Sequence, residues 1–315
     1  MQMYLLKPYC AKAIWGGKNL NLKYGKTDYE DIAEAWELSG YKGKESVVAS
    51  GNEKGLTINE LVDKYGKSAF LGTKAEKHDK FPLLIKFIDA AAPLSIQVHP
   101  SDENAKDLGA DGGKTEMWII CDCEEGAFLY FGAKERISPE LFRSAILDGS
   151  ITEYLNKVPV KKGDTFFIKA GTIHAIGAGI TICEIQQTSD TTYRLYDYKR
   201  KDKDGNEREL HIEKGIVASN LEPVSDFYEK GVMDGCELKL VSCPFFNVSR
   251  IEVKADCEIF VDKDSFAALT VTDGDGVMTS EASTVTVSKG DTVFVPANSG
   301  KITLNGGMTV VKSTL

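Results

Sequence analysis

The chain has 315 residues, of which 42% are hydrophobic, and a formal net charge of −9 with an isoelectric point near 5.2. A chain of this length buries a substantial core and is typical of two domains. The acidic balance lacks the basic stripe that nucleic-acid binding needs, so a nucleic-acid partner is excluded. An anionic small molecule is not excluded, because a few local cations are enough to hold one phosphate.

The sequence carries no sign of export or of membrane insertion. Residues 1–8 contain no apolar run long enough for a signal peptide. No stretch approaches the roughly 18 apolar residues of a membrane span. The seven cysteines are scattered, and Cys121 and Cys123 lack the two-residue gap typical of zinc ribbons and redox pairs. We therefore expect a cytoplasmic protein with no membrane partner and with free thiols.

The predicted elements in chain order begin with a helix. Thr57 and Glu60 have the spacing of a capping box, which predicts a helix over Leu61–Phe70. Strands follow, because short β-branched and aromatic runs alternate with Gly, Asp and Asn; they include Leu83–Ile88, Met117–Ile120, Phe128–Phe131, Thr165–Ile168, Thr181–Gln186, Leu238–Val241 and Phe245–Val253. This spacing of strands predicts a mainly β fold, either a sandwich or a barrel.

Two further helices are predicted among the strands. Ser138 followed by Pro139 is the pattern of an N-cap and a first helical residue, and it leads into a helix over Leu141–Leu147. A third helix is expected over Ile212–Ser219. All three helices are short, so we interpret them as peripheral additions to the β core.

One turn-and-strand unit occurs twice. Residues 162–168, Lys-Gly-Asp-Thr-Phe-Phe-Ile, return 127 residues later as residues 289–295, Lys-Gly-Asp-Thr-Val-Phe-Val. The match over a turn, a strand and the next turn favours an internal duplication. We place the boundary after residues 229–235. Residues 1–235 then form the catalytic domain and residues 236–315 a degenerate second domain.

Four side chains in the first copy and before it form a candidate metal site. In a strand, residues two apart share a face, so Ser95, Gln97 and His99 point the same way. Glu116 opens the next apolar run, and His174 ends the turn–strand–turn unit. One amide, two imidazoles and one carboxylate suit a borderline divalent ion such as Zn²⁺. A single strand histidine is usually structural, but the joint pattern favours a metal site.

These fragments resemble a known family. Gly163, Lys169, Gly171 and His174 have the spacing of the second cupin motif, with Lys169 where proline is usual. Gln97, His99 and Glu116 resemble the first cupin motif, with a glutamine in place of its first histidine. Together with Ile-Trp-Gly-Gly at 14–17 and Lys-Thr-Glu-Met at 114–117, this variant resembles type I mannose-6-phosphate isomerases in their short bacterial form. The resemblance implies two cupin-like jelly-roll β-barrels with a few peripheral helices.

The resemblance also implies roles for individual residues. One Zn²⁺ per chain would be held by Gln97, His99, Glu116 and His174. The active-site residues would be Lys114, Asp190 and Arg194. The substrate phosphate would lie against Ser95 and Arg200. The second copy has Lys301 where the first has His174, so we expect the C-terminal domain to hold no metal.

The implied activity is the interconversion of mannose 6-phosphate and fructose 6-phosphate through an enediol(ate). Lys114, Asp190 and a zinc-bound water all stay open as the base. Gly113 stands where longer relatives have a histidine, so no role of that histidine is transferred. His78 is expected in a solvated loop and His211 on the surface.

Two other functions compete with this one. A cupin oxygenase usually has three histidines and a glutamate, and Gln97 counts against it. A non-catalytic sugar-binding protein would not need Lys114 and Arg194. The expected partner is a small sugar phosphate, and the expected assembly is a monomer or a weak homodimer.

Overall fold

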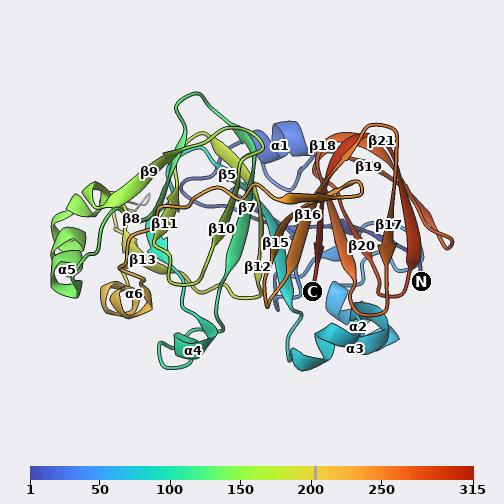
Figure 1. The fold of residues 1–315 in the computed structure, drawn as a ribbon, viewed down its shortest axis with the longest axis horizontal. Coiled ribbons are helices and arrows are strands. Elements are labelled where there is room, and N and C mark those ends of the chain that lie inside the picture. The colour runs from blue at the N-terminus through green and yellow to red at the C-terminus, as the bar shows by residue number, and fades with distance from the viewer. Residues whose placement is uncertain (202–203) are drawn as a thin grey trace.

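The computed structural model describes residues 1–201 and 204–315, and within these ranges three antiparallel sheets form most of the protein (Figure 1). The central sheet contains β10 (Thr165–Ile168), β7 (Glu116–Cys123), β12 (Ile180–Gln187), β5 (Leu83–Ala90), β3 (Glu34–Leu38) and β2 (Tyr9–Ala11), in that order. A five-stranded sheet contains β13 (Tyr193–Tyr196), β6 (Ile96–Val98), β11 (His174–Ile176), β8 (Phe128–Ala133) and β9 (Leu155–Pro159). The prediction of a mainly β protein is confirmed.

The third sheet has ten strands and belongs mostly to the C-terminal region. Its order is β14 (Val232–Asp234), β15 (Glu237–Ser242), β16 (Asn247–Val253), β21 (Gly300–Thr314), β18 (Ala267–Thr279), β20 (Thr292–Val295), β1 (Tyr4–Lys7) and β4 (Val47–Val48), while β17 (Asp256–Val261) pairs with β21 and β19 (Thr284–Ser288) with β18. The first strand of the chain thus lies in the sheet of the last residues. Both termini are accordingly found at this end of the molecule (Figure 1).

The central sheet is buried on both faces because alternate residues serve different cores. Trp118 and Ile182 point toward the five-stranded sheet, where they join a cluster with Leu129. Met117 and Cys183, one position along the same strands, join a cluster that includes Phe294 of the ten-stranded sheet. The near-continuous apolar runs of β5, β7 and β12 follow from this double burial.

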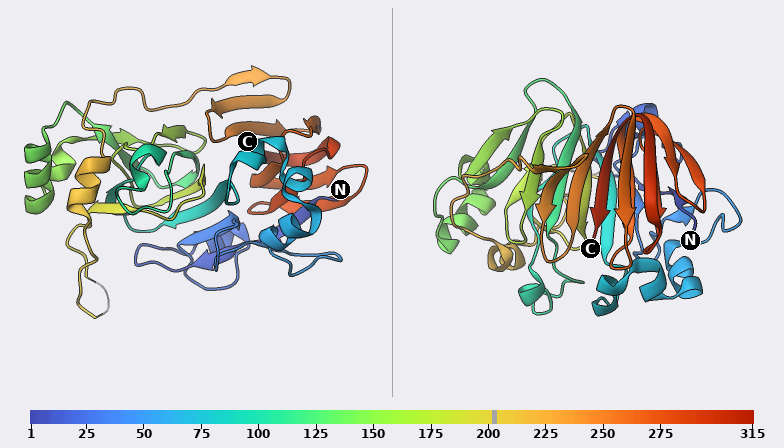
Figure 2. Two further views of the ribbon diagram at one scale, coloured as in Figure 1. Left: turned by 90° about the horizontal axis from the view of Figure 1, so that it is seen from below. Right: turned by 45° about the vertical axis from the view of Figure 1, so that its right-hand side comes forward.

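The helices lie around the sheets (Figure 2). They are α1 (Asn19–Tyr24), α2 (Ile58–Tyr65), α3 (Lys67–Leu71), α4 (Asp102–Ala105), α5 (Pro139–Asp148) and α6 (Ile212–Ala218), with 3₁₀ turns at Thr73–Lys77 and Ser150–Glu153. The caps predicted at Thr57 and Ser138 are both present. No helix in the described ranges is long and apolar enough to cross a membrane.

The predicted helix over Leu61–Phe70 is wrong in one respect. Gly66 has a φ of +85°, a conformation open to glycine, and it ends α2 and begins α3. The bend turns α3 so that Leu71 accepts a backbone hydrogen bond from Phe266 at 2.9 Å, in the C-terminal region. The break therefore anchors the helical segment to the ten-stranded sheet.

The two copies of the repeated unit have the same turn. Asp164 accepts a hydrogen bond from the backbone N–H of Lys161 at 2.9 Å, and Asp291 accepts one from Ser288 at 2.8 Å. Each turn leads into a strand, β10 or β20, over the predicted residues. The similarity predicted from the sequence therefore extends to backbone geometry.

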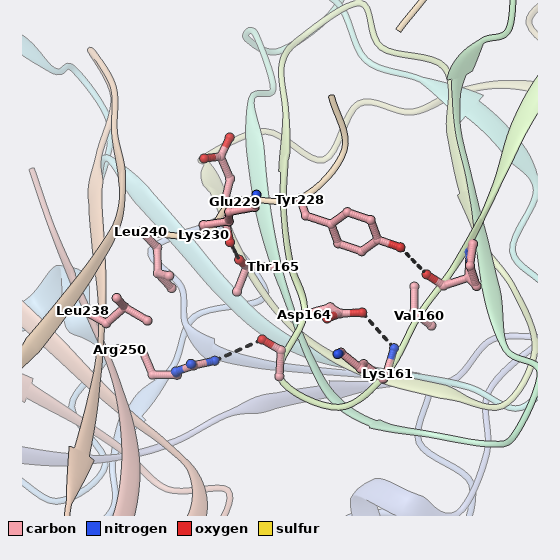
Figure 3. Close-up of a pocket in the computed structure, with 12 residues that line it drawn as sticks. Val160, Lys161, Asp164, Thr165, Tyr228, Glu229, Lys230, Leu238, Leu240 and Arg250 are labelled. Atoms are coloured by element: carbon pink, nitrogen blue, oxygen red, sulfur yellow. Dashed lines mark hydrogen bonds between the residues drawn. The ribbon is translucent and has the colours of Figure 1, made fainter. Parts of the chain in front are cut away.

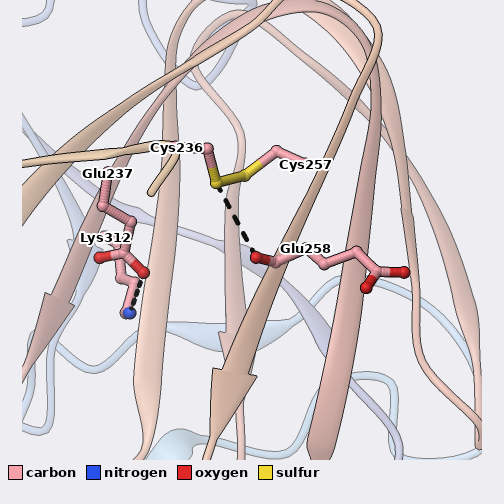
Figure 4. Close-up of a disulfide and its surroundings, with 5 residues drawn as sticks. All are labelled: Cys236, Glu237, Cys257, Glu258 and Lys312. Carbon is pink, nitrogen blue, oxygen red and sulfur yellow. Dashed lines mark hydrogen bonds and ion pairs between the residues drawn. A yellow bond between two sulfur atoms is a disulfide. The ribbon is translucent and has the colours of Figure 1, made fainter. Parts of the chain in front are cut away.

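The expectation that all seven cysteines are free is wrong. Cys236, at the turn between β14 and β15, forms a disulfide with Cys257 on β17 (Figure 4). The remaining five are free thiols. The pair was not predictable because the two residues lie 21 positions apart without a motif. They meet because Glu237 pairs with Ile251 of β16, and β16 and β17 follow one another along the same edge of β21.

A connecting segment crosses from α6 to β14 and lines a groove of about 600 Å³ between the start of β10 and the ten-stranded sheet (Figure 3). Tyr228 donates its hydroxyl hydrogen to the carbonyl of Pro159 at 2.7 Å. Arg250 reaches across the groove and donates to the carbonyl of Gly163 at 3.0 Å. The first contact holds the segment against β9, and the second holds the turn before β10 against β16 of the ten-stranded sheet.

A buried ion pair joins the N-terminal segment to the second copy of the repeat. Lys26 Nζ lies 2.8 Å from Glu37 Oε1 and donates to the carbonyl of Gly290 at 2.7 Å. Both charged side chains are buried. Burial raises the pKa of Glu37 to about 7, although Lys26 acts in the opposite direction.

We expect Lys26→Met to destabilise the protein by roughly 3–5 kcal/mol, because Glu37 is then buried without its partner. The double variant Lys26→Met/Glu37→Met should regain most of this loss, since neither charge remains. Denaturant unfolding of the wild type, Lys26→Met, Glu37→Met and the double variant gives the free energy of unfolding of each, and the four values form a double-mutant cycle. A single variant as stable as the wild type would contradict the importance of the pair.

Candidate metal centre and pocket

Two paired strands of the five-stranded sheet and one strand of the facing central sheet bring the predicted metal ligands together. Gln97 lies in β6 and pairs in register with His174, the first residue of β11. His99 follows β6, and Glu116 begins β7 in the facing central sheet. Ile96 and Val98 point away into a separate apolar cluster, as the alternation predicts. Side chains from two sheets therefore converge between them.

The two imidazoles are oriented by backbone carbonyls. His99 Nδ1 lies 2.9 Å from the carbonyl oxygen of Thr191, and His174 Nδ1 lies 2.8 Å from that of Thr172. A carbonyl oxygen only accepts, so each Nδ1 carries the hydrogen and each Nε2 presents its lone pair. This is the arrangement typical of metal-binding histidines.

The two Nε2 atoms face the carboxylate of Glu116. The distances are 3.3 Å from His99 to Oε1 and 3.7 Å from His174 to Oε2. The amide of Gln97 lies beside them, with Nε2 3.3 Å from His174 Nε2. A half-turn of that amide exchanges its nitrogen and oxygen, so it can present either atom to the centre.

The electrostatics of the cluster suit a cation. Burial would raise the pKa of Glu116, but the positive charge of Lys114 beside it holds that pKa well below its usual range. Burial lowers the pKa of His174 to about 3 and lowers that of His99 as well. An ionised carboxylate therefore faces two neutral imidazoles.

The residues present fit a bound metal ion. The three ligand atoms of His99, Glu116 and His174 all lie within 4.8 Å of one another, and the side chains are fully buried. Neither carboxylate oxygen of Glu116 accepts a well-formed hydrogen bond, although Lys114 Nζ lies 2.6 Å from Oε1. In the described part of the chain, no second cluster of this kind occurs. Lys301 points outward and pairs with Glu258 at 2.9 Å.

A cavity of about 220 Å³ opens beside this cluster. It is much smaller than the groove beside β10, but it is lined by more charged side chains. Among the residues singled out from the sequence, it is lined by Ser95, Gln97, Lys114, Asp190 and Arg194. Lys114 is buried next to Glu116, and Asp190 forms an ion pair with Lys44 at 2.6 Å. Arg194 has a buried Nε without a hydrogen-bond partner.

Arg200 does not line the cavity. Its guanidinium donates to the carbonyl of Pro93 at 2.6 Å and pairs with Asp197 behind the cavity wall. Arg208 holds the same carboxylate, with Nε 2.7 Å from Oδ2, and it does line the cavity. One buried carboxylate thus positions two guanidinium groups near Arg194.

Sequence analysis missed four charged residues of the cavity: Glu34, Lys86, Glu184 and Arg208. Lys86 Nζ lies 3.5 Å from a carboxylate oxygen of Glu34 and 3.6 Å from one of Glu184. Burial raises the pKa of Glu184 to about 7, with Glu116 adding to the effect. The available signal was a charged residue inside a run of apolar ones, Lys86 between Ile85 and Phe87 in β5 and Glu184 between Cys183 and Ile185 in β12.

Both histidines set aside in the sequence analysis lie outside the cluster. His78 is half-buried at the end of a 3₁₀ turn. His211 is also only half-buried, yet its Nδ1 accepts a hydrogen bond from the backbone N–H of Arg194 at 3.1 Å. His211 therefore supports a cavity residue without entering the cavity.

Comparisons with known proteins agree with this geometry. Residues 3–117 match the model of the phosphomannose isomerase type I catalytic domain, and residues 236–315 match that of the mannose-6-phosphate isomerase cupin domain. A mannose-6-phosphate isomerase from Bacillus subtilis is 37% identical over 95% of both chains. One from Streptococcus mutans is 35% identical over 96% of this chain and 95% of its own.

Solved structures show the same relationship. The crystal structure of the mannose 6-phosphate isomerase from Bacillus subtilis covers 100% of both chains with a TM-score of 0.90 and 33% identity. A mannose 6-phosphate isomerase bound with zinc and yttrium has a TM-score of 0.82 over 99% of both chains at 19% identity, which shows a shared fold. The protein is thus a cupin with a buried candidate metal centre. The chain belongs to the type I mannose-6-phosphate isomerase family.

Proposed function

We propose that the protein interconverts mannose 6-phosphate and fructose 6-phosphate. The observation that carries the proposal is a buried cluster of two imidazole lone pairs and one carboxylate beside a cavity lined by cations. The full-length similarity to mannose-6-phosphate isomerases supports it. The reaction moves a proton between C1 and C2 of the sugar through an enediol(ate), with no net change in oxidation state.

We assign one Zn²⁺ to the cluster, held by Gln97, His99, Glu116 and His174. When bound, Zn²⁺ supplies a Lewis acid without redox chemistry. The second shell is already in place, because both Nδ1–H groups donate to carbonyls. Lys114 lies against Glu116, where its positive charge can stabilise a developing negative charge on substrate oxygens.

Proton transfer needs a group that changes charge near neutral pH. Lys114, Asp190 and Glu184 all line the cavity. With a pKa of about 7, Glu184 matches this requirement best, and the indole N–H of Trp118 orients it by donating to Oε2 at 2.8 Å. In the direction of ketose formation, Glu184 would take the proton from C2 and return it to C1, while the hydroxyl proton on O2 would pass to O1 to give the C1 hydroxyl and the C2 carbonyl of the ketose. Arg194 would stabilise the charge on the intermediate through its free Nε.

The phosphate lies at the far end of the cavity in this proposal. Ser95 offers a hydroxyl there, and Arg208 lines the wall. Arg200 acts with Arg208 through their shared carboxylate, Asp197. Two guanidinium groups on one carboxylate leave a net positive charge, which suits a phosphate. Holding the phosphate away from the reacting carbons contributes orientation.

The competing functions fit less well. A cupin oxygenase usually has three histidines and a glutamate, whereas Gln97 stands in the place of one histidine here. A passive sugar-binding site has no need of a glutamate with a pKa near 7. The isomerase reaction uses this glutamate.

We also propose a division of labour along the chain. Residues 1–235 would carry the chemistry, and residues 236–315 would buttress the central sheet without a metal. For the assembly, we propose a monomer or a weak homodimer. A cytoplasmic location fits a phosphorylated substrate, which cells retain inside.

Chelation should abolish isomerase activity, and Zn²⁺ should restore it. His174→Ala should remove the metal with little loss of soluble protein, because the sheets are held by their apolar faces. Metal analysis combined with a coupled assay of mannose 6-phosphate turnover measures both effects. Undiminished turnover by a verified metal-free preparation would exclude the metal proposal.

Glu184→Gln should lower kcat by about 10²–10⁴-fold, the usual contribution of a general base. In the wild type, kcat/KM should fall as the pH falls through about 7, because protonation of Glu184 removes the base. Asp190→Asn is the comparison. If that variant loses the acidic limb of the pH profile and Glu184→Gln retains it, Asp190 is the base instead.

Arg208→Ala should raise KM for mannose 6-phosphate by roughly ten- to a hundredfold, the value of one charge-assisted contact. Arg200→Ala should raise KM by a smaller factor, since Arg200 lies behind the wall. Weak turnover of unphosphorylated mannose should barely change in either variant. Arg136→Ala, an exposed arginine, is the matched control. Equal losses on both sugars would show that these arginines are structural.

A further inference from the structure

We propose that Asp111 is a positioning residue that holds His99 in its metal-binding orientation, through the loop of residues 189–191. Asp111 lies in the loop after α4 and touches neither the cavity nor the ligand cluster. The proposal rests on the role of His99 as a metal ligand given above. It adds a residue that no spacing motif singles out.

The two candidate ligand histidines are oriented in different ways. His174 donates to Thr172, a carbonyl two residues away in its own turn. His99 donates to Thr191, which is 92 residues away in sequence. The ring of His174 is therefore fixed locally. The ring of His99 depends on whatever holds the loop that carries Thr191.

Gln186 Nε2 donates to the carbonyl of Ser189 at 2.8 Å, and Asp111 is the side chain that bonds every residue of that loop. Its Oδ1 accepts the hydroxyl hydrogens of Thr191, at 2.7 Å, and of Ser189. Its Oδ2 accepts the backbone N–H of Asp190 at 3.2 Å. Its own backbone N–H donates to Thr191 Oγ1 at 3.2 Å. One half-buried side chain thus contacts all three residues of the loop.

Asp111 is itself fixed from the other side. Lys80 Nζ donates to its backbone carbonyl at 2.7 Å, and the hydroxyl of Tyr41 bonds its carboxylate. Burial would raise the pKa of Asp111, but the hydrogen bonds from Ser189 and Thr191 lower it, so the ionised acceptor form is favoured. The carboxylate is a fixed point to which the loop is attached.

The same loop carries Asp190 toward the cavity. Asp190 pairs with Lys44, whose ammonium group lies 4.5 Å from the ring centre of Trp36. Tyr41 belongs to the same segment as Lys44 and contacts Asp111. Asp111 therefore joins the loop to the segment at the cavity mouth.

The test is zinc affinity, measured on metal-free protein by competition with a chromophoric chelator. Asp111→Asn should weaken zinc binding by about tenfold, at the lower end of the effect of outer-shell partners. Asp107→Asn removes the same charge from an exposed position four residues earlier and should bind zinc as the wild type does. Thermal unfolding of each metal-free variant establishes that it is folded.

A second readout follows the hydrogen itself. By proton NMR of the metal-free protein, the Nδ1–H of His99 should exchange with solvent faster in Asp111→Asn than in the wild type. The Nδ1–H of His174 should be unchanged, because its carbonyl partner is local. A residue that only stabilised the fold would not separate the two histidines.

The outcomes are distinct. Folded Asp111→Asn with wild-type zinc affinity and unchanged exchange at His99 would overturn the proposal. If that variant does not fold, Thr191→Val keeps the carbonyl but removes both hydrogen bonds between the Thr191 hydroxyl group and Asp111. It should weaken zinc binding by about fivefold, and wild-type affinity would overturn the proposal. Failure of the wild type to bind zinc would instead count against the metal centre itself.

Discussion

The register of the central sheet is the constraint on which the rest of the structure depends. Along β7, Glu116 and Trp118 face the five-stranded sheet, where Glu116 joins the candidate metal cluster, while Met117 and Ile119 face the core shared with the ten-stranded sheet. The strand period is two, so a slip of one residue would exchange the two faces. Such a slip would place Glu116 in the core shared with the ten-stranded sheet and Met117 in the candidate metal cluster. The geometry of the candidate site and the packing of the sheets are therefore set by the same hydrogen-bond ladder.

Cross-strand pairing explains how several charges can be buried in one place. Lys86 lies opposite Glu184 on β12 and opposite Trp36 on β3. Its pKa is raised, because the neighbouring carboxylates outweigh the effect of its burial. A buried charge is tolerated only when it is paired. Lys86 lies between the carboxylates of Glu34 and Glu184, so each of these buried charges has a partner. All three residues belong to paired strands, which fixes their positions.

The sequence was informative wherever chemistry or turn geometry is local. The bounds of β10 and the capping box at Thr57 follow from residues within a few positions of one another. The ligand cluster was also predictable, because Gln97 and His99 share a strand face and His174 belongs to a recognisable turn.

Residues whose role depends on the neighbouring strand were missed. Lys86 and Glu184 lie inside runs interpreted as core strands, and only the pairing of β5 with β12 shows that they complement each other. No sequence motif links Arg208 to Arg194. Its place at the cavity becomes clear only from its ion pair with Asp197 in the structure. The disulfide and the bend at Gly66 likewise depend on contacts with the C-terminal sheet.

The place of β1 has a consequence for how the protein is made. Tyr4 pairs with Phe294, so one of the first strands to leave the ribosome has its partner near the end of the message. Until β20 is synthesised, the edge of β1 that pairs with β20 has no partner. The apolar face of the central sheet that packs near Phe294 is exposed for the same period. The N-terminal two-thirds of the chain must therefore wait, partly open, for the last third. Slow translation of that stretch would lengthen the period in which nascent chains are open to aggregation.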